Sequence, residues 1–255
     1  MVSISDFEPV IPRARLGFII PASNRMVEPQ VQHFCPDDVV PHFARAGITN
    51  RHSAPLSELK QRITYQAELL GDSKVNVVVL QCTGTSMGDG PEAEEEVVKA
   101  MAEASGAKAL STARCVTSAL AAIQAKKLVF VSESKEVGHS KKERYLRGQG
   151  YQLLKSKGMG LPGSDYSCTT PSDYWFQAMA EMRDPEAEAY FISCANVHAT
   201  YKIPELEELL GASVLTSNQA ALWCALRTAG IGDDIPGLGS LFRFQLASRT
   251  AAAAK

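Results

Sequence analysis

The segment VVVLQCTGTS (residues 77–86) is an apolar run that ends on a cysteine and continues into a Thr-Gly-Thr turn. A second segment, AYFISCANVHA (residues 189–199), has the same form, with a cysteine between an apolar run and small polar residues. Short continuous apolar runs are typical of strands that are buried on both faces of a parallel sheet. Ligands bind beyond the carboxyl ends of such strands, so both cysteines are expected at a ligand site.

Similar apolar runs alternate with helical patterns along the whole chain. The predicted strands lie at residues 15–20, 75–80, 108–111, 126–131, 189–193 and 212–216. The predicted helices lie at residues 55–70, 91–105, 113–124, 139–157, 171–182, 204–210 and 217–229. This alternation predicts an α/β fold in which mainly parallel sheets are flanked by helices.

An internal repeat divides the chain. Cys194 follows Cys82 by 112 positions, and Leu128 follows Leu16 by the same interval. A third pair, ALSTARCVTSALAAI and SVLTSNQAALWCALRTAGI, repeats a short strand, a Ser/Thr turn and an Ala-rich helix. The repeats predict two pseudo-symmetric lobes with the active site at their interface. The expected first lobe comprises residues 14–115 with 213–246, the second 116–212, and residues 247–255 form a disordered or appended tail.

The composition limits the class of partner. The chain has 255 residues, 45% of them hydrophobic, and a net charge of −2. Such a chain can bury a sizeable core, and it has no broad basic surface for nucleic acid or an anionic membrane. The amino terminus does not resemble a signal peptide, and no apolar stretch approaches the roughly 20 residues of a membrane helix. We therefore expect a cytoplasmic protein with a small-molecule partner.

The six cysteines are scattered, without a CxxC pair or zinc-ligand spacing, so no metal site is predicted. The chain also lacks Walker, GxGxxG and HExxH motifs, and no cofactor is expected. Cys115 and Cys224 lie in Ala- and Leu-rich helical segments and are predicted to pack in the core, whereas Cys35 and Cys168 are assigned no role.

Cys82 and Cys194 are the candidate catalytic residues. A thiol at a helix amino terminus has a stabilised thiolate, and its pKa can fall from about 8.5 towards neutrality, which suits a base or nucleophile. Donors for an oxyanion follow each cysteine, namely Thr83, Gly84, Thr85 and Asn196. The competing interpretation is that each cysteine is a small buried hydrophobe.

Other polar residues near the predicted strand ends are candidate substrate contacts. Each has a competing structural role in capping, turns, packing or a solvated face. The candidates are Ser23, Asn24, Thr117, Ser118, Glu133, Val197 and His198. The segment TSNQ (216–219) is predicted mainly to cap a helix, and residues 135–148 are predicted to form a charged helical face.

Four segments resemble the aspartate/glutamate racemase superfamily, in particular its branch of maleate cis-trans isomerases and arylmalonate decarboxylases. The segments are GFIIPASNRMVEP, LQCTGTS, SCANVHA and VLTSNQAALWCALRTAGI, within a resemblance that spans residues 15–246. The resemblance implies that substrate carboxylates lie between two lobes, that Asn24 binds a carboxylate, and that Cys82 and Cys194 are the catalytic pair. It also implies a homo-oligomer.

Several reactions are compatible with the resemblance. The isomerases imply addition of the Cys82 thiolate to a cis double bond, rotation, and elimination, with Cys194 as acid/base partner. Racemases use two such thiols to exchange an α-proton, and arylmalonate decarboxylases have glycine at the first cysteine position. Cis-trans isomerisation of a maleate-like dicarboxylate is the leading prediction; a racemase or decarboxylase of a related acid and a non-catalytic binding protein are the alternatives.

One departure concerns the turn after the strand at 126–131. Maleate isomerases usually continue with Pro-Tyr there, whereas this chain has Ser132, Glu133 and Ser134. An acidic side chain beside a dicarboxylate costs affinity unless it points away or is protonated. The sequence is therefore also compatible with a substrate other than maleate.

Overall fold

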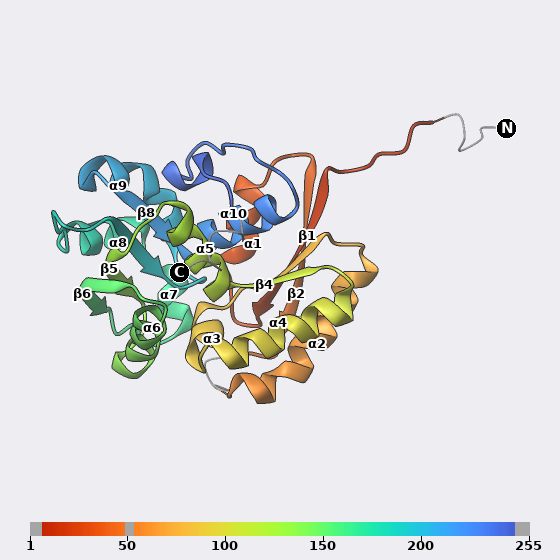
Figure 1. Ribbon diagram of the computed structural model, residues 1–255, viewed down its shortest axis with the longest axis horizontal. Helices are drawn as coiled ribbons and strands as arrows, with labels where there is room; N and C mark the ends of the chain where they lie inside the picture. The colour runs from red at the N-terminus through yellow and green to blue at the C-terminus, as the bar shows by residue number, and fades with distance from the viewer. Residues whose placement is uncertain (1–6, 49–53, 248–255) are drawn as a thin grey trace, which may run out of the picture.

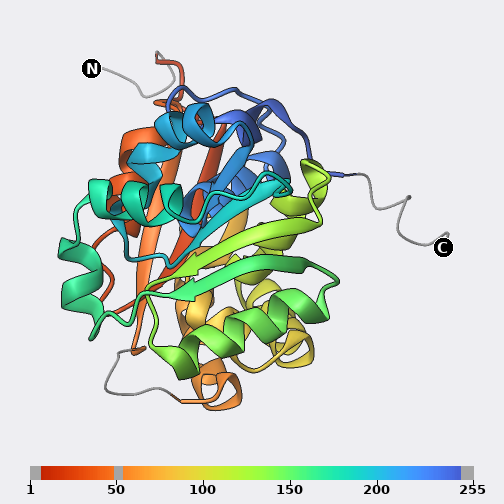
Figure 2. The same ribbon diagram turned by 90° about the vertical axis from the view of Figure 1, so that its left-hand side faces the viewer.

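Two four-stranded parallel sheets form the frame of the protein in a computed structural model that describes residues 7–48 and 54–247 (Figures 1 and 2). The first sheet has the order β2-β1-β3-β4, with β1 at Ala14–Pro21, β2 at Val39–Ala46, β3 at Val77–Leu80 and β4 at Lys108–Ser111. The second has the order β6-β5-β7-β8, with β5 at Lys127–Ser132, β6 at Gln152–Gly158, β7 at Ala189–Ser193 and β8 at Ser213–Thr216.

The two sheets repeat one another strand by strand. Leu16 of β1 pairs with Val77 of β3, and Leu128 of β5 pairs with Ala189 of β7, so each pair reappears 112 positions later. All of the pairings are parallel. The predicted fold class, two pseudo-symmetric lobes of parallel strands flanked by helices, is confirmed.

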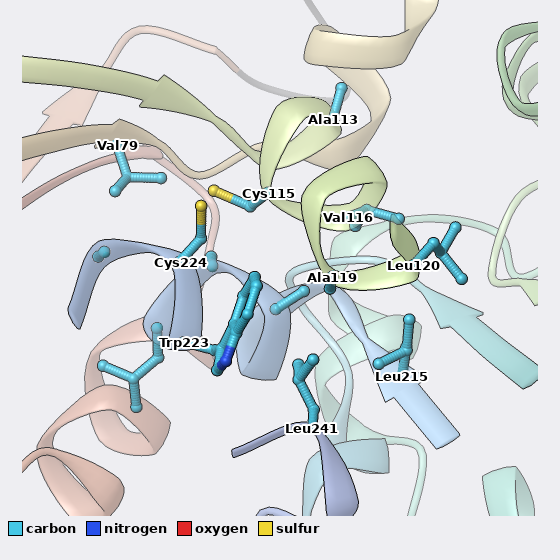
Figure 3. Packing of buried hydrophobic residues seen from close by; sticks show 14 of the residues in the cluster. Val79, Ala113, Cys115, Val116, Ala119, Leu120, Leu215, Trp223, Cys224 and Leu241 are labelled. Carbon is cyan, nitrogen blue, oxygen red and sulfur yellow. The ribbon is translucent and has the colours of Figure 1, made fainter. Parts of the chain in front are cut away.

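Helices α5 (Thr112–Ala122) and α10 (Ser217–Thr228) pack against each other and connect the cores of the lobes. One buried cluster runs from β1 and β3 through these helices to β5, β7 and β8. Figure 3 shows Trp223 beside Ala119 at this contact, and the sulfur atoms of Cys115 and Cys224 point toward each other. Both thiols are buried, as predicted.

Other helices cover the outer faces of the sheets (Figure 1). Helices α2 (Leu56–Asp72) and α4 (Pro91–Ser105) pack on the first sheet, and α8 (Ser172–Ala180) and α9 (Ile203–Leu210) pack on the second. The remaining elements are α1 (Val27–Phe34), α3 (Thr83–Gly88), α6 (Glu136–Gly148), α7 (Ser164–Thr169) and the 3-10 helices η2 (His198–Lys202) and η3 (Ser240–Arg243). None of the helices in the described ranges is both long and apolar enough to cross a membrane.

Strand β2, at one edge of the first sheet, and strand β6, at one edge of the second, were not predicted. The expected helix at 139–157 is wrong in its second half, because α6 ends at Gly148 and Gly150 adopts a left-handed φ of 83° before β6 begins. Both strands are only partly buried and lack the continuous apolar run of a central strand, and β2 also contains Pro41.

The expected lobe boundaries also differ from the structure. Strand β8 was assigned to the first lobe with residues 213–246, but it pairs with β7 in the second sheet. The boundary at 115/116 falls inside α5. The position of α10 accounts for the first difference, because this helix follows β8 of the second sheet but contacts β3 and β4 of the first. Most of the expected tail, 248–255, lies outside the described residues.

The close approach of α2 and α4 gives a test of the outer layer. A Cβ on Gly71 would lie 2.6 Å from the backbone oxygen of Ser105, whereas a Cβ on Gly148 would meet nothing within 4 Å. We expect Gly71→Ala to lower the free energy of unfolding by about 1–3 kcal/mol, because the backbones must separate. Gly148→Ala is the matched control and should leave it unchanged or raise it by up to about 1 kcal/mol. Urea denaturation followed by circular dichroism measures both, and equal losses in the two variants would contradict this account.

Candidate active site

A cavity of about 650 Å³ lies between the lobes, at the carboxyl ends of β1, β3, β5 and β7. Both predicted catalytic cysteines line it, one from each lobe. Nine of the predicted site residues belong to its wall: Ser23, Asn24, Cys82, Thr83, Gly84, Thr85, Glu133, Cys194 and Asn196. The fold therefore brings together polar side chains that are far apart in the sequence.

Cys82 occupies the amino end of α3. Its backbone is extended (φ −147°, ψ 101°), and the helix begins at the next residue, Thr83. The Sγ of Cys82 donates a hydrogen bond to Oγ1 of Thr85 at 3.0 Å. Helix α3 contacts α6 of the second lobe, so this thiol lies close to the lobe interface.

Cys194 follows β7 in an uncommon backbone conformation. Its φ is 121°, a region that residues with a side chain adopt at a cost of about 1–3 kcal/mol. The Sγ accepts the backbone N–H of Asn196 at 3.3 Å, and the Cys194 N–H donates to Oγ of Ser217 at 3.1 Å. These two bonds hold the strained residue with its sulfur in the cavity wall.

The hydroxyl of Ser217 connects the two cysteine loops. Its Oγ accepts hydrogen bonds from Oγ1 of Thr83 at 2.8 Å and from the backbone N–H of Cys194 at 3.1 Å. The predicted cap in TSNQ is present, but Thr216 and Gln219 form it. Ser217 is thus free to act as a tie between the lobes, a role that the sequence pattern did not reveal.

A buried amide network lies behind this tie and was also missed. Oδ1 of Asn218 accepts from Nε2 of Gln81 at 2.9 Å, and its Nδ2 donates to Oε1 of Gln30 at 2.7 Å. Gln81 directly precedes Cys82, so the amides fix the end of β3 against α10. The sequence signal that could have indicated this network is the polar Gln81 between the apolar run of β3 and Cys82.

The environments of the two thiols differ. Burial raises the pKa of Cys82, and Thr85 opposes that rise because its hydroxyl and its backbone N–H can donate to the thiolate once Cys82 ionises. Burial raises the pKa of Cys194 well above its ordinary value, and the carboxylate of Glu133 raises it further. The predicted shift of the thiol pKa towards neutrality is therefore wrong, because desolvation outweighs the amino end of a helix of only six residues.

Asn24 and Asn196 connect the lobes at the cavity. Oδ1 of Asn24 accepts the N–H groups of Met26 and Val27, at 3.0 and 2.9 Å, and its Nδ2 donates to the oxygen of Ala195 at 2.9 Å. The Asn196 amide accepts from the Arg25 N–H at 2.8 Å. Asn24 combines the turn-forming role that was the competing prediction with a position in the cavity wall.

Glu133 and Lys142 form an ion pair in the wall of the second lobe. The Lys142 Nζ lies 2.9 and 2.7 Å from the two carboxylate oxygens of Glu133 and 2.9 Å from Oγ of Ser134. The Lys142 side chain is only 3% exposed. Part of the predicted charged face of α6 is therefore buried at the cavity, and Glu133 reaches it paired with a cation.

Four predicted site residues are not among the cavity-lining residues. Thr117 and Ser118 lie in the interior of α5, where Ser111 provides the amino-terminal cap. The carbonyl of Val197 accepts from Gln30, and Nε2 of His198 lies 2.8 Å from the oxygen of Cys168. These positions point to structural roles. Among residues 7–48 and 54–247, no group of three or more His, Cys, Asp or Glu side chains is placed to hold a metal ion.

Replacing Ser217 by alanine tests the tie between the lobes. Ser217→Ala removes the acceptor of both the Thr83 hydroxyl and the Cys194 N–H, so we expect the free energy of unfolding to fall by about 1–3 kcal/mol. Ser140→Ala, which removes only an exposed contact with Glu136, is the control. Chemical denaturation compares the variants; if Ser217→Ala is as stable as the control, the tie does not stabilise the interface.

Known proteins share this architecture over most of the chain. A family model described as arylmalonate decarboxylase matches residues 16–242. The arylmalonate decarboxylase of Bordetella bronchiseptica is 23% identical over 233 residues, which cover 89% of this chain and 95% of that protein. The maleate isomerase of Nocardia farcinica is 23% identical over 239 residues, with coverage of 90% and 95%.

Solved structures agree with this relationship at the level of the fold. A variant of the maleate isomerase Iso from Pseudomonas putida S16, with maleate, has a TM-score of 0.85 at 17% identity and covers 90% of this chain and 97% of that one. A variant of the Nocardia farcinica maleate cis-trans isomerase, with a covalently bound succinylcysteine intermediate, has a TM-score of 0.82 at 22% identity, with coverage of 90% and 98%. Because the family model spans nearly all of both lobes, the chain belongs to the arylmalonate decarboxylase family.

Proposed function

We propose that this protein is a cofactor-independent isomerase that converts a small cis-unsaturated carboxylic acid of the maleate type into its trans isomer. The observation that carries the proposal is the pair of thiols, Cys82 and Cys194, on opposite lobes of one cavity in unequal environments. A pair of titratable groups whose surroundings separate their pKa values has its acid and base roles assigned by those surroundings. The relatives that include maleate isomerases favour the same reaction.

We assign Cys82 as the nucleophile and Cys194 as the acid because burial and Glu133 together raise the pKa of Cys194 well above its ordinary value, whereas Thr85 opposes the rise at Cys82. As a thiolate, Cys82 bonds to one alkene carbon, and the π-electron pair takes the proton of Cys194 at the other carbon. The resulting single bond rotates. The Cys194 thiolate then removes a proton from the same carbon, the double bond re-forms, and the Cys82 thiolate leaves. Protons and electrons balance over the cycle, and covalent addition replaces a double-bond rotation by a single-bond rotation.

The first lobe offers the donors for a substrate carboxylate. The first turn of α3 begins at Thr83, and its backbone N–H groups have no partner within the helix. The amide of Asn24 also lines this cavity. Together these groups suit a carboxylate beside the alkene carbon that Cys82 attacks, and they stabilise negative charge that develops during addition.

Racemisation or decarboxylation of a related acid is the second candidate. Two thiols on opposite faces of a ligand also suit removal and return of an α-proton. The decarboxylases that the chain resembles have glycine where this chain has Cys82, which weighs against decarboxylation. A non-catalytic binding protein is the third candidate. Slow alkylation of Cys82 and Cys194 would not be evidence for it, because an active enzyme with these raised thiol pKa values would also be alkylated slowly.

Proton NMR of the reduced protein with maleate in D2O tests the proposal. We expect fumarate from the unaltered protein and none from Cys82→Ser or Cys194→Ser. In Cys194→Ser, Cys82 still adds to the alkene and the other carbon takes its proton more slowly from water, while the thiolate base that reverses the addition is missing. Mass spectrometry of that variant should therefore show an adduct on Cys82 with the added mass of one maleic acid. Deuterium exchange at a saturated carbon of a 2-substituted acid, or carbon dioxide release from phenylmalonate, without any cis-trans conversion, would favour the second candidate instead.

The pH dependence follows from the direction of the thiol shifts. Cys82 must be ionised, and its pKa is raised, so kcat/KM should still increase with pH above neutrality and decline only where Cys194 ionises. Thr85→Val removes the hydrogen bond that lowers the pKa of Cys82, so the rising limb should move to higher pH and the neutral rate should fall about 10-fold. Thr117→Val, outside the cavity, is the control. An unshifted profile in Thr85→Val would remove Thr85 from this role.

A further inference from the structure

The buried ion pair in the cavity wall carries an inference about the substrate. Glu133 follows β5 and Cys194 follows β7, at adjacent strand ends where Ser132 pairs with Ser193. The charge of Glu133 acts on both thiols, so its carboxylate lies within electrostatic reach of the reacting centre. The backbone on either side is fixed, because Glu133 and Ser134 accept N–H bonds from Leu161 and Gly160 at 2.9 and 3.0 Å.

The side chains of Glu133, Ser134 and Lys142 form a hydrogen-bonded cluster that can offer a ligand an acceptor but no donor. The ammonium group of Lys142 has three hydrogens, and its three partners are the two oxygens of Glu133 and Oγ of Ser134. Ser134 in turn donates to Oε1 of Glu133 at 3.1 Å. Within the described residues, Oε2 of Glu133 accepts only from Lys142, so one of its lone-pair positions remains open.

The open acceptor decides what kind of group can lie against this wall. A second substrate carboxylate would place acceptor against acceptor and charge against charge, and it could bond to Oε2 only by taking up a proton. An ammonium group on the substrate would lie close to the ammonium group of Lys142, and the two positive charges would repel each other. An uncharged N–H or O–H group has neither difficulty, and a hydrogen bond to an ionised acceptor is stronger than one between neutral groups.

From this geometry we infer that the substrate is a monocarboxylate whose second polar group, facing Glu133, carries an uncharged hydrogen-bond donor such as a carboxamide or hydroxyl. The inference rests on the proposed isomerase reaction and specifies its substrate class. The carboxylate end lies toward the first lobe, beside Cys82 and Asn24, and the donor end lies toward Oε2 of Glu133. Lys142 is a positioning residue that fixes the carboxylate of Glu133.

Lys135 and Lys141 provide the competing site for a second carboxylate. Both line the cavity, and both are exposed at its α6 side. An exposed ammonium group binds a carboxylate weakly because water and salt screen it. A dicarboxylate bound there would leave the acceptor of Glu133 without a ligand donor, so the two arrangements predict opposite substrate preferences.

Three acids of nearly the same shape distinguish these arrangements: maleamate, maleate and monomethyl maleate. They are compared at about pH 8, where both carboxyl groups of maleate are ionised. We expect kcat/KM for maleamate to exceed those for the other two acids by about 10- to 100-fold, because only maleamate donates to Glu133. Equal rates for maleamate and monomethyl maleate would overturn the inference, since the ester lacks the donor but has the same charge. A preference for maleate would overturn it in favour of the two lysines.

The double variant Glu133→Gln/Lys142→Met links the preference to the ion pair and avoids an unpaired buried charge. Its glutamine can donate as well as accept, so the preference for maleamate over maleate should fall at least about 10-fold. Glu136→Gln, three positions away and outside the cavity wall, should leave the preference unchanged. An unchanged preference in the double variant would contradict the assignment.

Binding to Cys82→Ser keeps the inference separate from the proposed reaction. Isothermal titration calorimetry with this variant, which cannot form the covalent adduct, should give the same order of affinity, with maleamate bound most tightly. If no acid is isomerised by the unaltered protein but this order holds, the isomerase reaction fails and the substrate class stands. If isomerisation occurs but the order is absent or reversed, the substrate class fails alone.

Discussion

The packing of α10 across the lobe interface fixes the relative position of the two thiols. Cys82 and Cys194 end strands of separate sheets, so no hydrogen-bonded ladder determines the distance between them. Helix α10 leaves the second sheet at Thr216, contacts the first sheet and packs against α5. Its first residue, Ser217, binds both cysteine loops. Because successive residues of a helix are rotated by about 100°, only one rotation of α10 satisfies both its buried face and this bridge. Core packing thereby sets the geometry of the site.

The same interface explains how two chemically identical groups acquire different roles. Burial acts on both sulfurs in the same direction and raises the pKa of each. The difference comes from their neighbours: the Thr85 hydroxyl of α3 lies beside Cys82, whereas the carboxylate of Glu133 is the largest influence on the pKa of Cys194 after burial. A symmetric ancestor of two equal lobes would give two equivalent thiols. The departures from symmetry in the loops, rather than the fold itself, give the two thiols the different surroundings that the proposed roles require.

The sequence pattern predicted the frame of this site because that frame depends on local signals. Central parallel strands require continuous apolar runs, and the interval of 112 positions shared by Leu16 with Leu128 and Cys82 with Cys194 reflects the duplication. The edge strands β2 and β6 lack such runs, since one face or one edge of each is solvated. The tie through Ser217 and the burial of Lys142 depend on contacts between distant segments. Neither residue differs locally from a helix cap or a charged helical face, so no local pattern could identify them.

The ion pair of Glu133 and Lys142 is better explained by orientation than by stability. Taking two charges out of water costs free energy that their attraction often fails to exceed, so a buried pair is weak evidence for stabilisation. Here Lys142 is almost fully buried while Glu133 lines the cavity, and its Oε2 accepts from no described side chain other than Lys142. All three ammonium hydrogens of Lys142 have partners, and one of these partners, Ser134, is itself fixed because its backbone oxygen accepts the N–H of Gly160. Lys142 therefore holds Oε2 of Glu133 in one place before a ligand binds. A fixed acceptor requires no reorganisation during the reaction, and this is the condition under which a polar group contributes most to binding and catalysis.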